Sequence, residues 1–482
     1  MFDWKPVLYV IGHLLLVLAG GMVFPALVDA AEGNRDWQNF AASVAITCAA
    51  GAILIASSHA PRIRLDRRQG FVLTTLAWVA MSGFGALPFL FSDVVSGYPN
   101  AFFEAVSGFT TTGSTIMVGL DQMPPGILLW RSILQWLGGI GIIAMAVAML
   151  PFLGVGGMQL FRMESSDRSD KAVPRARQLA ASLFAIYVAA SALCALAYWA
   201  LGMTFFEAVC HAMTTIATGG YSTTDSSFGK FDSPALHWTA VLFMLVGAFP
   251  FVLYLNALRG RPGELFGNAQ VRGYIILVGC AVLAAALWIW LTRDIALPKA
   301  LTLAAFNVVS VVTTTGYASA DYMEWGNFAI MLFLVLTFIG GCAGSTSGGI
   351  KYYRLHILAD YVIKRIRQLP YPSSVSPSSY DGRPLSPDIR LAIATFFFLY
   401  VVTVGAIAFL LALFEIDFLT SLSAAATAVG NVGPGLGPII GPAGNFASLP
   451  DAVKWILSFG MLLGRLELFT VIVLFSRAFW RS

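Results

Sequence analysis

Four short segments rich in threonine and glycine recur along the chain, and their residue types suit the binding of a monovalent cation stripped of water. They cover residues 110–114, 216–220, 313–317 and 430–434. A loop whose successive carbonyl oxygens point the same way needs backbone angles that glycine adopts without a steric cost. Rings of such carbonyls, with threonine hydroxyls beside them, can replace the hydration shell of an ion. The segments predict an ion filter built from four loops.

Close packing of membrane helices is the alternative explanation, because threonine and glycine are also the small residues of such contacts. One isolated segment would be explained that way. Four segments at the same position of a repeated unit favour the filter.

Composition places the chain in a membrane. Of its 482 residues, 58% are hydrophobic and 11% are charged, which is more apolar surface than water-soluble domains bury. About ten apolar stretches are long enough to cross a bilayer. They cover residues 8–30, 40–58, 71–91, 127–150, 179–201, 236–258, 274–292, 328–363, 389–414 and 452–476.

The four segments lie between members of the last eight stretches, which indicates a repeated unit. Each segment follows about ten mostly apolar residues, enough for a helix that stops halfway across the bilayer. The sequence Phe-Phe-Glu-Ala-Val at 102–106 returns at 205–209. We therefore predict an all-α polytopic membrane protein, with two leading helices and four units of span, pore helix, filter loop and span around one pore. The two leading helices are predicted to cover residues 1–65, and the four units to cover 66–165, 166–265, 266–375 and 376–482.

Charge sets the predicted orientation, because lysine and arginine gather on the cytoplasmic side of membrane proteins. Most of the 29 basic residues lie at the two ends of the chain or in the stretches 62–68, 162–177, 259–272 and 351–390. Both termini are then cytoplasmic, and all four Thr/Gly segments are re-entrant from the outside. Acidic residues in the outer loops would concentrate cations there. Basic residues confined to membrane flanks leave no face for nucleic acid.

The stretch 328–363 is interrupted by Gly-Gly-Cys-Ala-Gly-Ser-Thr-Ser-Gly-Gly at 340–349. Each glycine in a helix costs roughly 1 kcal/mol relative to alanine, so this run predicts a break. Because the stretch follows the third segment, the break should lie just on the cytoplasmic side of the filter. A kinked packing helix is the alternative.

Arg465 is a lone strong charge deep in the last stretch. A buried arginine is expensive in lipid, so it should face a pore or a carboxylate. An ion pair with Glu467 is the alternative to the pore-facing position, although residues two apart on a helix point in different directions.

These features together resemble the superfamily of Trk, Ktr and HKT potassium transporters, and within it the bacterial Trk-type (TrkH-like) membrane subunits. The resemblance covers essentially the whole chain and is carried by residues 111–113, 218–222, 314–317 and 430–435. Two extra leading helices favour the Trk type over the Ktr type.

The resemblance implies which residues form the filter. The implied ion ligands are Thr111, Thr112, Gly113, Thr218, Gly219, Gly220, Thr314, Thr315, Gly316, Asn431, Val432 and Gly433. The filter glycines are then Gly113, Gly219, Gly316 and Gly433. Gly220 is an alternative to Gly219, and Gly430 is an alternative to Gly433. A serine at the first filter position goes with sodium permeation in this superfamily, so Gly113 favours potassium.

The resemblance also implies a gate and partners. The break looks like an intramembrane gating loop, here Gly344, Ser345, Thr346, Ser347 and Gly348, with Arg465 pointing to the path below the filter. The implied assembly is a homodimer in the lipid of the bacterial inner membrane, above a cytosolic nucleotide-binding subunit similar to TrkA. Potassium is the implied transported ion, and this chain is expected to bind no organic cofactor.

We predict potassium uptake through a channel-like pore driven by the membrane potential. The alternative is a proton- or sodium-coupled secondary transporter, but such carriers usually have inverted halves, whereas these four units share one orientation. An intramembrane enzyme would have to use Ser345 or Ser347 with His356. The chain contains no HExxH or GxSxG motif, so we expect no enzymatic activity.

Overall fold

The computed structural model describes residues 2–58, 65–149, 172–371, 379–380 and 383–481. The predicted unit boundaries at 165 and 375, and the basic residues within 62–64 and 162–171, lie outside the described residues. The boundary predicted at 265 lies within the short helix α12 (Gly263–Gly267).

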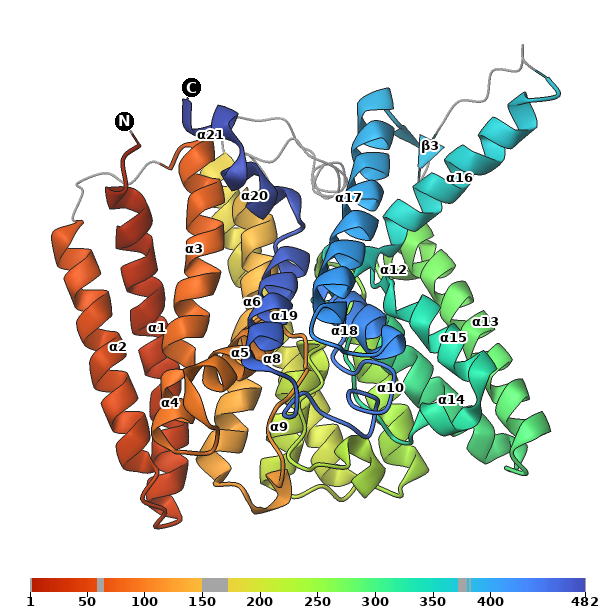
Figure 1. Ribbon diagram of the computed structural model, residues 1–482. Helices are drawn as coiled ribbons and strands as arrows, with labels where there is room; N and C mark the ends of the chain where they lie inside the picture. Colours follow the sequence, from red (N-terminus) through yellow and green to blue (C-terminus); the bar gives the residue numbers. More distant parts are fainter. Residues whose placement is uncertain (1, 59–64, 150–171, 372–378, 381–382, 482) are drawn as a thin grey trace.

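Two leading helices, α1 (Lys5–Ala31) and α2 (Trp37–Ser57), form a hairpin at one edge of the molecule (Figure 1). Gly12 and Gly51 face each other in this hairpin. A Cβ atom at Gly12 would lie 2.8 Å from the Gly51 carbonyl oxygen, and one at Gly51 would lie 2.9 Å from that of Gly12. The two glycines thus let the helix backbones approach closely, as small residues do in membrane proteins.

The rest of the chain repeats one pattern four times: an outer helix, a short helix that ends inside the bundle, a loop, and a second long helix (Figure 1). The first unit contains α3 (Arg67–Gly85), α4 (Leu87–Phe91), the short helix α5 (Gly97–Phe109) and α6 (Pro125–Met149). The second contains α8 (Ala172–Ala200), the short helix α9 (Phe205–Ile216), α10 (Pro234–Ala248) and α11 (Phe251–Leu258).

The third unit contains α13 (Ala269–Thr292), the short helix α14 (Leu297–Val312), α15 (Asn327–Thr337) and α16 (Tyr352–Gln368). The fourth contains α17 (Pro387–Ala412), the short helix α18 (Phe418–Gly430), α19 (Asp451–Arg465) and α20 (Phe469–Ile472), and α21 (Arg477–Arg481) follows. We call α5, α9, α14 and α18 the half-helices. The predicted fold class is confirmed.

Small elements complete the described chain. Four 3₁₀ turns cover Leu120–Gln122, Ser227–Lys230, Tyr322–Trp325 and Val473–Phe475. The two-residue strands β1 (Ile339–Gly340) and β2 (Ile350–Lys351) pair in parallel, with Ile339 opposite Ile350. Strands β3 (Ser379–Tyr380) and β4 (Arg383–Pro384) pair antiparallel.

Within the described residues, 7 helices are long and apolar enough to cross a membrane. Two stretches predicted as continuous spans are instead broken. The 236–258 stretch bends by 95° between α10 and α11, because Pro250 disfavours the helical conformation at Phe249, which is extended with ψ of 159°. The 452–476 stretch bends by 108° after α19, where Glu467 and Leu468 both have positive φ. The break predicted in 328–363 is present between α15 and α16.

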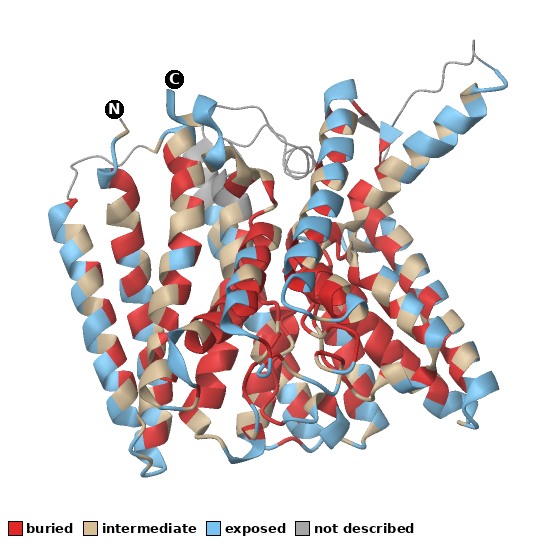
Figure 2. Cartoon of the chain, in the orientation of Figure 1, coloured by how far each residue is buried: buried red, intermediate tan, exposed pale blue. Residues whose placement is uncertain are grey.

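Burial separates the centre of the bundle from its surface (Figure 2). Most residues of each half-helix are buried, and in α5 every residue from Asn100 to Phe109 is buried. Helices α8, α13 and α17 expose large apolar side chains instead, among them Leu193, Ile276 and Phe398. Apolar residues on the outside and a buried centre fit a protein surrounded by lipid.

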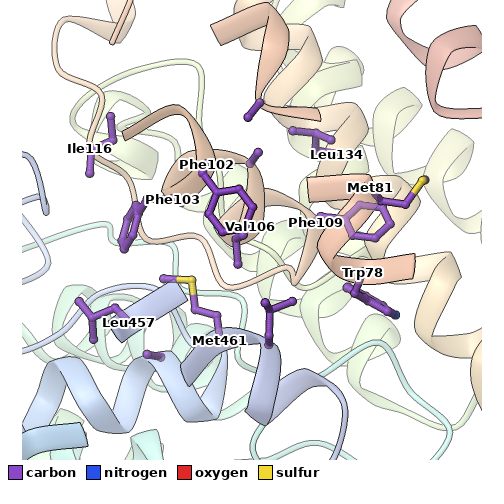
Figure 3. Close-up of a cluster of buried hydrophobic side chains, with 14 of the residues drawn as sticks. Trp78, Met81, Phe102, Phe103, Val106, Phe109, Ile116, Leu134, Leu457 and Met461 are labelled. Carbon is purple, nitrogen blue, oxygen red and sulfur yellow. The ribbon is translucent and has the colours of Figure 1, made fainter. Parts of the chain in front are cut away.

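The half-helix α5 is fixed by apolar side chains from three neighbouring helices (Figure 3). Phe109 lies against Trp78 of α3, with 4.6 Å between their ring centroids. Leu134 of α6 and Leu457 and Met461 of α19 belong to the same buried cluster. This packing ties the first unit to the fourth and determines where α5 ends.

A polar contact joins the leading hairpin to the first unit. Asp29, near the end of α1, is fully buried, and its Oδ1 accepts a hydrogen bond of 2.8 Å from the backbone N–H of Gly126 at the start of α6. A carboxylate at a helix N-terminus satisfies an N–H that has no partner within the helix. The chain termini lie at the same end of the molecule (Figure 1), as the predicted topology requires.

Substitution of Asp29 tests this contact. We expect Asp29→Leu to lower the free energy of unfolding by about 1–3 kcal/mol, the cost of leaving a buried N–H without an acceptor. Asp29→Asn keeps an acceptor oxygen and should stay closer to the parent. Thermal melting of the purified protein in detergent measures both, with Glu32→Ala, at an exposed position near the same helix end, as the control. Equal melting of Asp29→Leu and the parent would contradict the assignment.

Candidate ion filter and gate

All four half-helices end in the same hydrogen-bonding pattern. In each, a backbone N–H donates to the carbonyl five residues earlier. The four pairs are Thr112 to Ser107 at 2.9 Å, Gly219 to Thr214 at 2.8 Å, Thr315 to Ser310 at 2.8 Å, and Val432 to Thr427 at 3.1 Å. This is the Schellman arrangement of a helix C-terminus. The four segments therefore leave their helices in one shared geometry.

The residue before each of these donors adopts the left-handed conformation. The φ angles are 53° at Thr111, 51° at Thr218, 59° at Thr314 and 53° at Asn431. Left-handed φ is a rare outlier for a β-branched residue such as threonine, at a cost on the order of 1–3 kcal/mol for each. Such strain persists where the surrounding structure imposes it, and here it marks the same position in three segments.

A glycine with positive φ follows two residues later in each segment. The angles are 88° at Gly113, 77° at Gly220, 84° at Gly316 and 109° at Gly433. The backbone thus places Gly220, and not Gly219, in register with the other filter glycines. Gly433 is in register in the fourth segment, because Gly430 is the last residue of α18. We call residues 111–113, 218–220, 314–316 and 431–433 the filter segments.

The filter segments form a closed ring. A Cβ atom at Gly113 would collide with the carbonyl oxygen of Gly219, and one at Gly220 with that of Thr315. A Cβ atom at Gly316 would likewise collide with the Val432 carbonyl oxygen. One at Gly433 would lie 2.8 Å from the Thr112 carbonyl oxygen, which closes the ring. Each glycine therefore adjoins the middle carbonyl of the next segment, and any side chain there would force two segments apart.

Hydrogen bonds on the outer side connect the segments in the same cyclic order. Tyr221 donates from its hydroxyl to the Glu104 carbonyl at 2.8 Å, and Tyr317 donates to the His211 carbonyl at 3.1 Å. The Ser114 hydroxyl donates to the Gly433 carbonyl at 2.8 Å. A polar cleft above the ring is lined by all four filter glycines and by Asp225. The negative C-terminal ends of four half-helices meet at this ring, which favours a cation there.

The loop at 340–349 lies directly against the other side of the filter segments. The Thr346 hydroxyl donates to the carbonyls of Ile216 at 2.9 Å and Gly247 at 3.0 Å. It also accepts a hydrogen bond of 3.2 Å from the Thr218 hydroxyl. The hydroxyls of Ser347 and Thr314 are 3.0 Å apart.

The backbone N–H of Gly348 donates to the Thr314 hydroxyl at 2.7 Å. Further bonds anchor the ends of the loop. The backbone N–H of Phe251 donates to the Gly344 carbonyl at 3.0 Å, and that of Ala343 donates to the side-chain oxygen of Gln270 at 2.9 Å. The Ser345 hydroxyl donates within the loop to the Cys342 carbonyl. The predicted gating residues are thus packed beneath the second and third filter segments.

Arg465 bonds to the backbone of this loop. Its guanidinium donates to the Thr346 carbonyl at 2.9 Å and to the Gly138 carbonyl at 3.5 Å. Glu467 pairs with Arg354 at 2.5 Å instead, so the alternative ion pair of Arg465 with Glu467 is not the one that forms. The Lys351 ammonium donates to the Ser347 carbonyl. Two basic side chains therefore bond to loop carbonyls below the filter segments.

Comparison with known proteins identifies the family. The profile of the family described as "TrkH: Cation transport protein" matches residues 36–482. This chain belongs to the TrkH family. The Trk system potassium uptake protein TrkI of Halomonas elongata is 48% identical over 99% of this chain and 97% of its own length. TrkH of Escherichia coli K12 is 37% identical over 99% of this chain and 100% of its own length.

The crystal structure of the potassium transporter TrkH from Vibrio parahaemolyticus has the same fold. It superposes with a TM-score of 0.93 at 34% identity and covers 100% of both chains. The chain is therefore a multi-pass membrane protein of a cation transport family.

Sequence reasoning missed a buried ion pair beside the candidate filter of this TrkH-family chain. Arg131 of α6 and Glu104 of α5 are 1% and 0% exposed, and their side chains are 2.9 Å apart. Arg131 also donates to the Ser222 carbonyl at 2.8 Å and lies over the Tyr221 ring at 4.0 Å. The available signal was Arg131 itself, a charge within an apolar stretch, which needs a partner in a membrane. The pair holds the chain that leaves the second filter segment.

Gly113→Ser tests the ring. The added Cβ would meet the Gly219 carbonyl, and overpacking of this kind costs about 1–3 kcal/mol, or roughly 5- to 150-fold in an equilibrium. We expect the potassium-to-sodium permeability ratio of reconstituted protein to fall by at least about fivefold, read from reversal potentials.

Gly119→Ser is the matched control. Gly119 also has positive φ, 78°, but nothing lies within 4 Å of a Cβ placed there. It therefore imposes the backbone strain without the collision. An unchanged ratio in conducting Gly113→Ser protein would remove Gly113 from the filter.

Proposed function

We propose that this chain takes up potassium through a channel-like pore whose filter is the ring of the four filter segments. The observation that carries the proposal is the closed contact of each filter glycine with the middle carbonyl of the next segment. A ring of backbone oxygens from four similar loops is the arrangement that replaces the water around a potassium ion. The printed names of the relatives, potassium uptake proteins of the Trk system, support the same ion.

The proposed ligands are the carbonyl oxygens of the filter segments, with threonine hydroxyls next to them. Thr112 and Thr315 bond through their hydroxyls to Thr110 and Thr313, at 2.7 and 2.8 Å. The hydroxyls of Thr218 and Thr314 bond instead to the 340–349 loop. In this proposal the hydroxyls of Thr218 and Thr314 are available to an ion only when the loop has moved.

The 340–349 loop is the proposed gate, and this conformation is its closed state. Thr346, Ser347 and Gly348 all bond to residues of the filter segments or their half-helices. Arg465 would stabilise the closed state twice, by its bond to the Thr346 carbonyl and by repelling a cation beneath the filter.

We further propose the cellular setting that the sequence predicts. Basic flanks place both termini in the cytoplasm of a bacterium, with the outer cleft facing away from it. Inward potassium movement is then favoured by about 2.3 kcal/mol per charge for each 100 mV of membrane potential. The proposed assembly is a homodimer in the inner membrane, controlled by a TrkA-like nucleotide-binding subunit. The leading hairpin and the four pore units are its functional segments.

Ion flux into liposomes tests the function. Purified protein should carry potassium or rubidium along an imposed voltage, with a reversal potential set by the potassium gradient and no movement of a second ion. Proton or sodium movement in fixed proportion to potassium would instead favour the coupled transporter. A reversal potential that ignores the potassium gradient would contradict both.

Arg465→Gln tests the gate. A charge at about 4 Å raises the energy of a cation by roughly 1–4 kcal/mol for effective dielectric constants between those of water and a protein surface. Removing that charge, and its bond to Thr346, should raise potassium flux, whereas Arg465→Lys keeps the charge and should stay near the parent.

Arg477→Gln, at an exposed position of α21, controls for loss of any basic residue. The measurement is initial rubidium uptake per folded protein. Equal instability and equal inactivity of both Arg465 variants would show that Arg465 supports the fold and does not regulate the pore.

A further inference from the structure

The middle position of the ring differs between the filter segments. Three segments have a side chain there, Thr112, Thr315 and Val432, and all three are fully buried. The second segment has Gly219 at this position. Each of these residues supplies the carbonyl that adjoins the next filter glycine. A glycine at one quarter of the ring leaves that carbonyl without a side chain to hold its peptide in place.

Gln135 of α6 occupies the place of the missing side chain. Its Nε2 donates to the Gly219 carbonyl at 2.6 Å, and its Oε1 accepts a hydrogen bond of 3.0 Å from the backbone N–H of Tyr221. The amide is fully buried. Only this orientation satisfies both contacts, because the reversed amide would place two oxygens and two donors face to face. Gln135 therefore fixes the peptides on both sides of Gly220.

The Gln135 side chain lies where a side chain of residue 219 would otherwise lie. A Cβ atom at Gly219 would collide with the Gln135 carboxamide and lie 2.8 Å from its Nε2. Gly219 is not among the residues with positive φ, so its backbone would accept a side chain if Gln135 were smaller. A group from α6 of the first unit thus takes up the space of a side chain at the middle position of the second segment.

Gln135 also lies one helical turn from Arg131, which bonds to the Ser222 carbonyl. Residues four apart on a helix share a face. The same face of α6 therefore holds the second segment at Gly219, Tyr221 and Ser222. None of these bonds involves the threonines of the filter segments or the loop at 340–349.

We propose that Gln135 is a positioning residue for ion selectivity, which holds the Gly219 carbonyl in line with the other three middle carbonyls of the ring. The proposal rests on the potassium function proposed above. Without Gln135 the second quarter of the ring can relax, so the size of the site would no longer favour potassium over sodium.

The first experiment exchanges the two side chains. We expect Gln135→Ala to lower the potassium-to-sodium permeability ratio by about three- to tenfold, the factor that the net strength of one hydrogen bond represents. Gly219→Thr alone should also lower it, because its side chain meets Gln135. The double variant Gln135→Ala/Gly219→Thr has a side chain at the middle position. Its potassium-to-sodium permeability ratio should return most of the way to that of the parent. Ser132→Ala, a buried hydroxyl of α6 that bonds to the Leu128 carbonyl of its own helix, is the control.

The second experiment separates positioning from packing. Gln135→Glu keeps the size and the acceptor for Tyr221, but its carboxylate cannot donate to the Gly219 carbonyl. Its permeability ratio should be low at high pH and rise as pH falls, because the protonated carboxyl group regains a donor. The parent ratio should not follow this profile, and no purely structural role produces it.

The outcomes are distinct. Folded, conducting Gln135→Ala and Gln135→Glu proteins with the parent ratio at every pH would overturn the proposal while leaving potassium uptake intact. A low ratio in Gln135→Ala that the double variant does not improve, together with a flat pH profile for Gln135→Glu, would also overturn it. A parent protein without potassium selectivity would refute the proposed function and this inference together.

Discussion

The structure depends on one steric constraint: four loops must meet so closely that each filter glycine touches a carbonyl of the next loop. Gly113, Gly220, Gly316 and Gly433 leave no room for a Cβ atom. All four also adopt positive φ, so two independent reasons require glycine. The half-helices, the apolar packing around α5 and the outer tyrosine bonds are the means by which these contacts are held. A change in any one unit is therefore transmitted to the ring.

Backbone polar groups at membrane depth explain much of the remaining architecture. Non-helical chain inside a bilayer is tolerated only where protein or a watery cavity satisfies it. The loop at 340–349 meets this requirement because the backbone N–H groups of Cys342 and Thr346 donate to the carbonyls of Ala248 and Gly247, and that of Gly348 donates to the Thr314 hydroxyl. The loop is also joined to the filter segments through the hydroxyls of Thr218 and Thr314. In the proposed gating, movement of the loop would release those hydroxyls at the moment when an ion can use them.

Charges inside the bundle are placed by the same logic. Arg131 and Glu104 neutralise each other on the outer side, where they hold the chain that leaves the filter. Arg465 bonds to carbonyl oxygens on the inner side, and Arg354 with Glu467 links the start of α16 to the bend after α19. A buried charge without a partner is costly. Arg465 would lose its bond to the Thr346 carbonyl if the loop moved, so this bond is suited to regulation.

The amino-acid sequence by itself determined the class of protein, the four units, the half-helices and the break at 340–349, because hydrophobic length and glycine content are local properties. It also located the four Thr/Gly segments, which leave their half-helices in one shared backbone geometry. Only the tertiary structure decided that Gly220 rather than Gly219 is in register, since that depends on φ angles imposed by neighbouring segments. The bends at Phe249 and Leu468, the partners of Arg465 and Glu467, and the contact of Gln135 with Gly219 likewise join residues that packing brings together. Such contacts leave no periodic signal in the chain, because their spacing is set by how the helices cross.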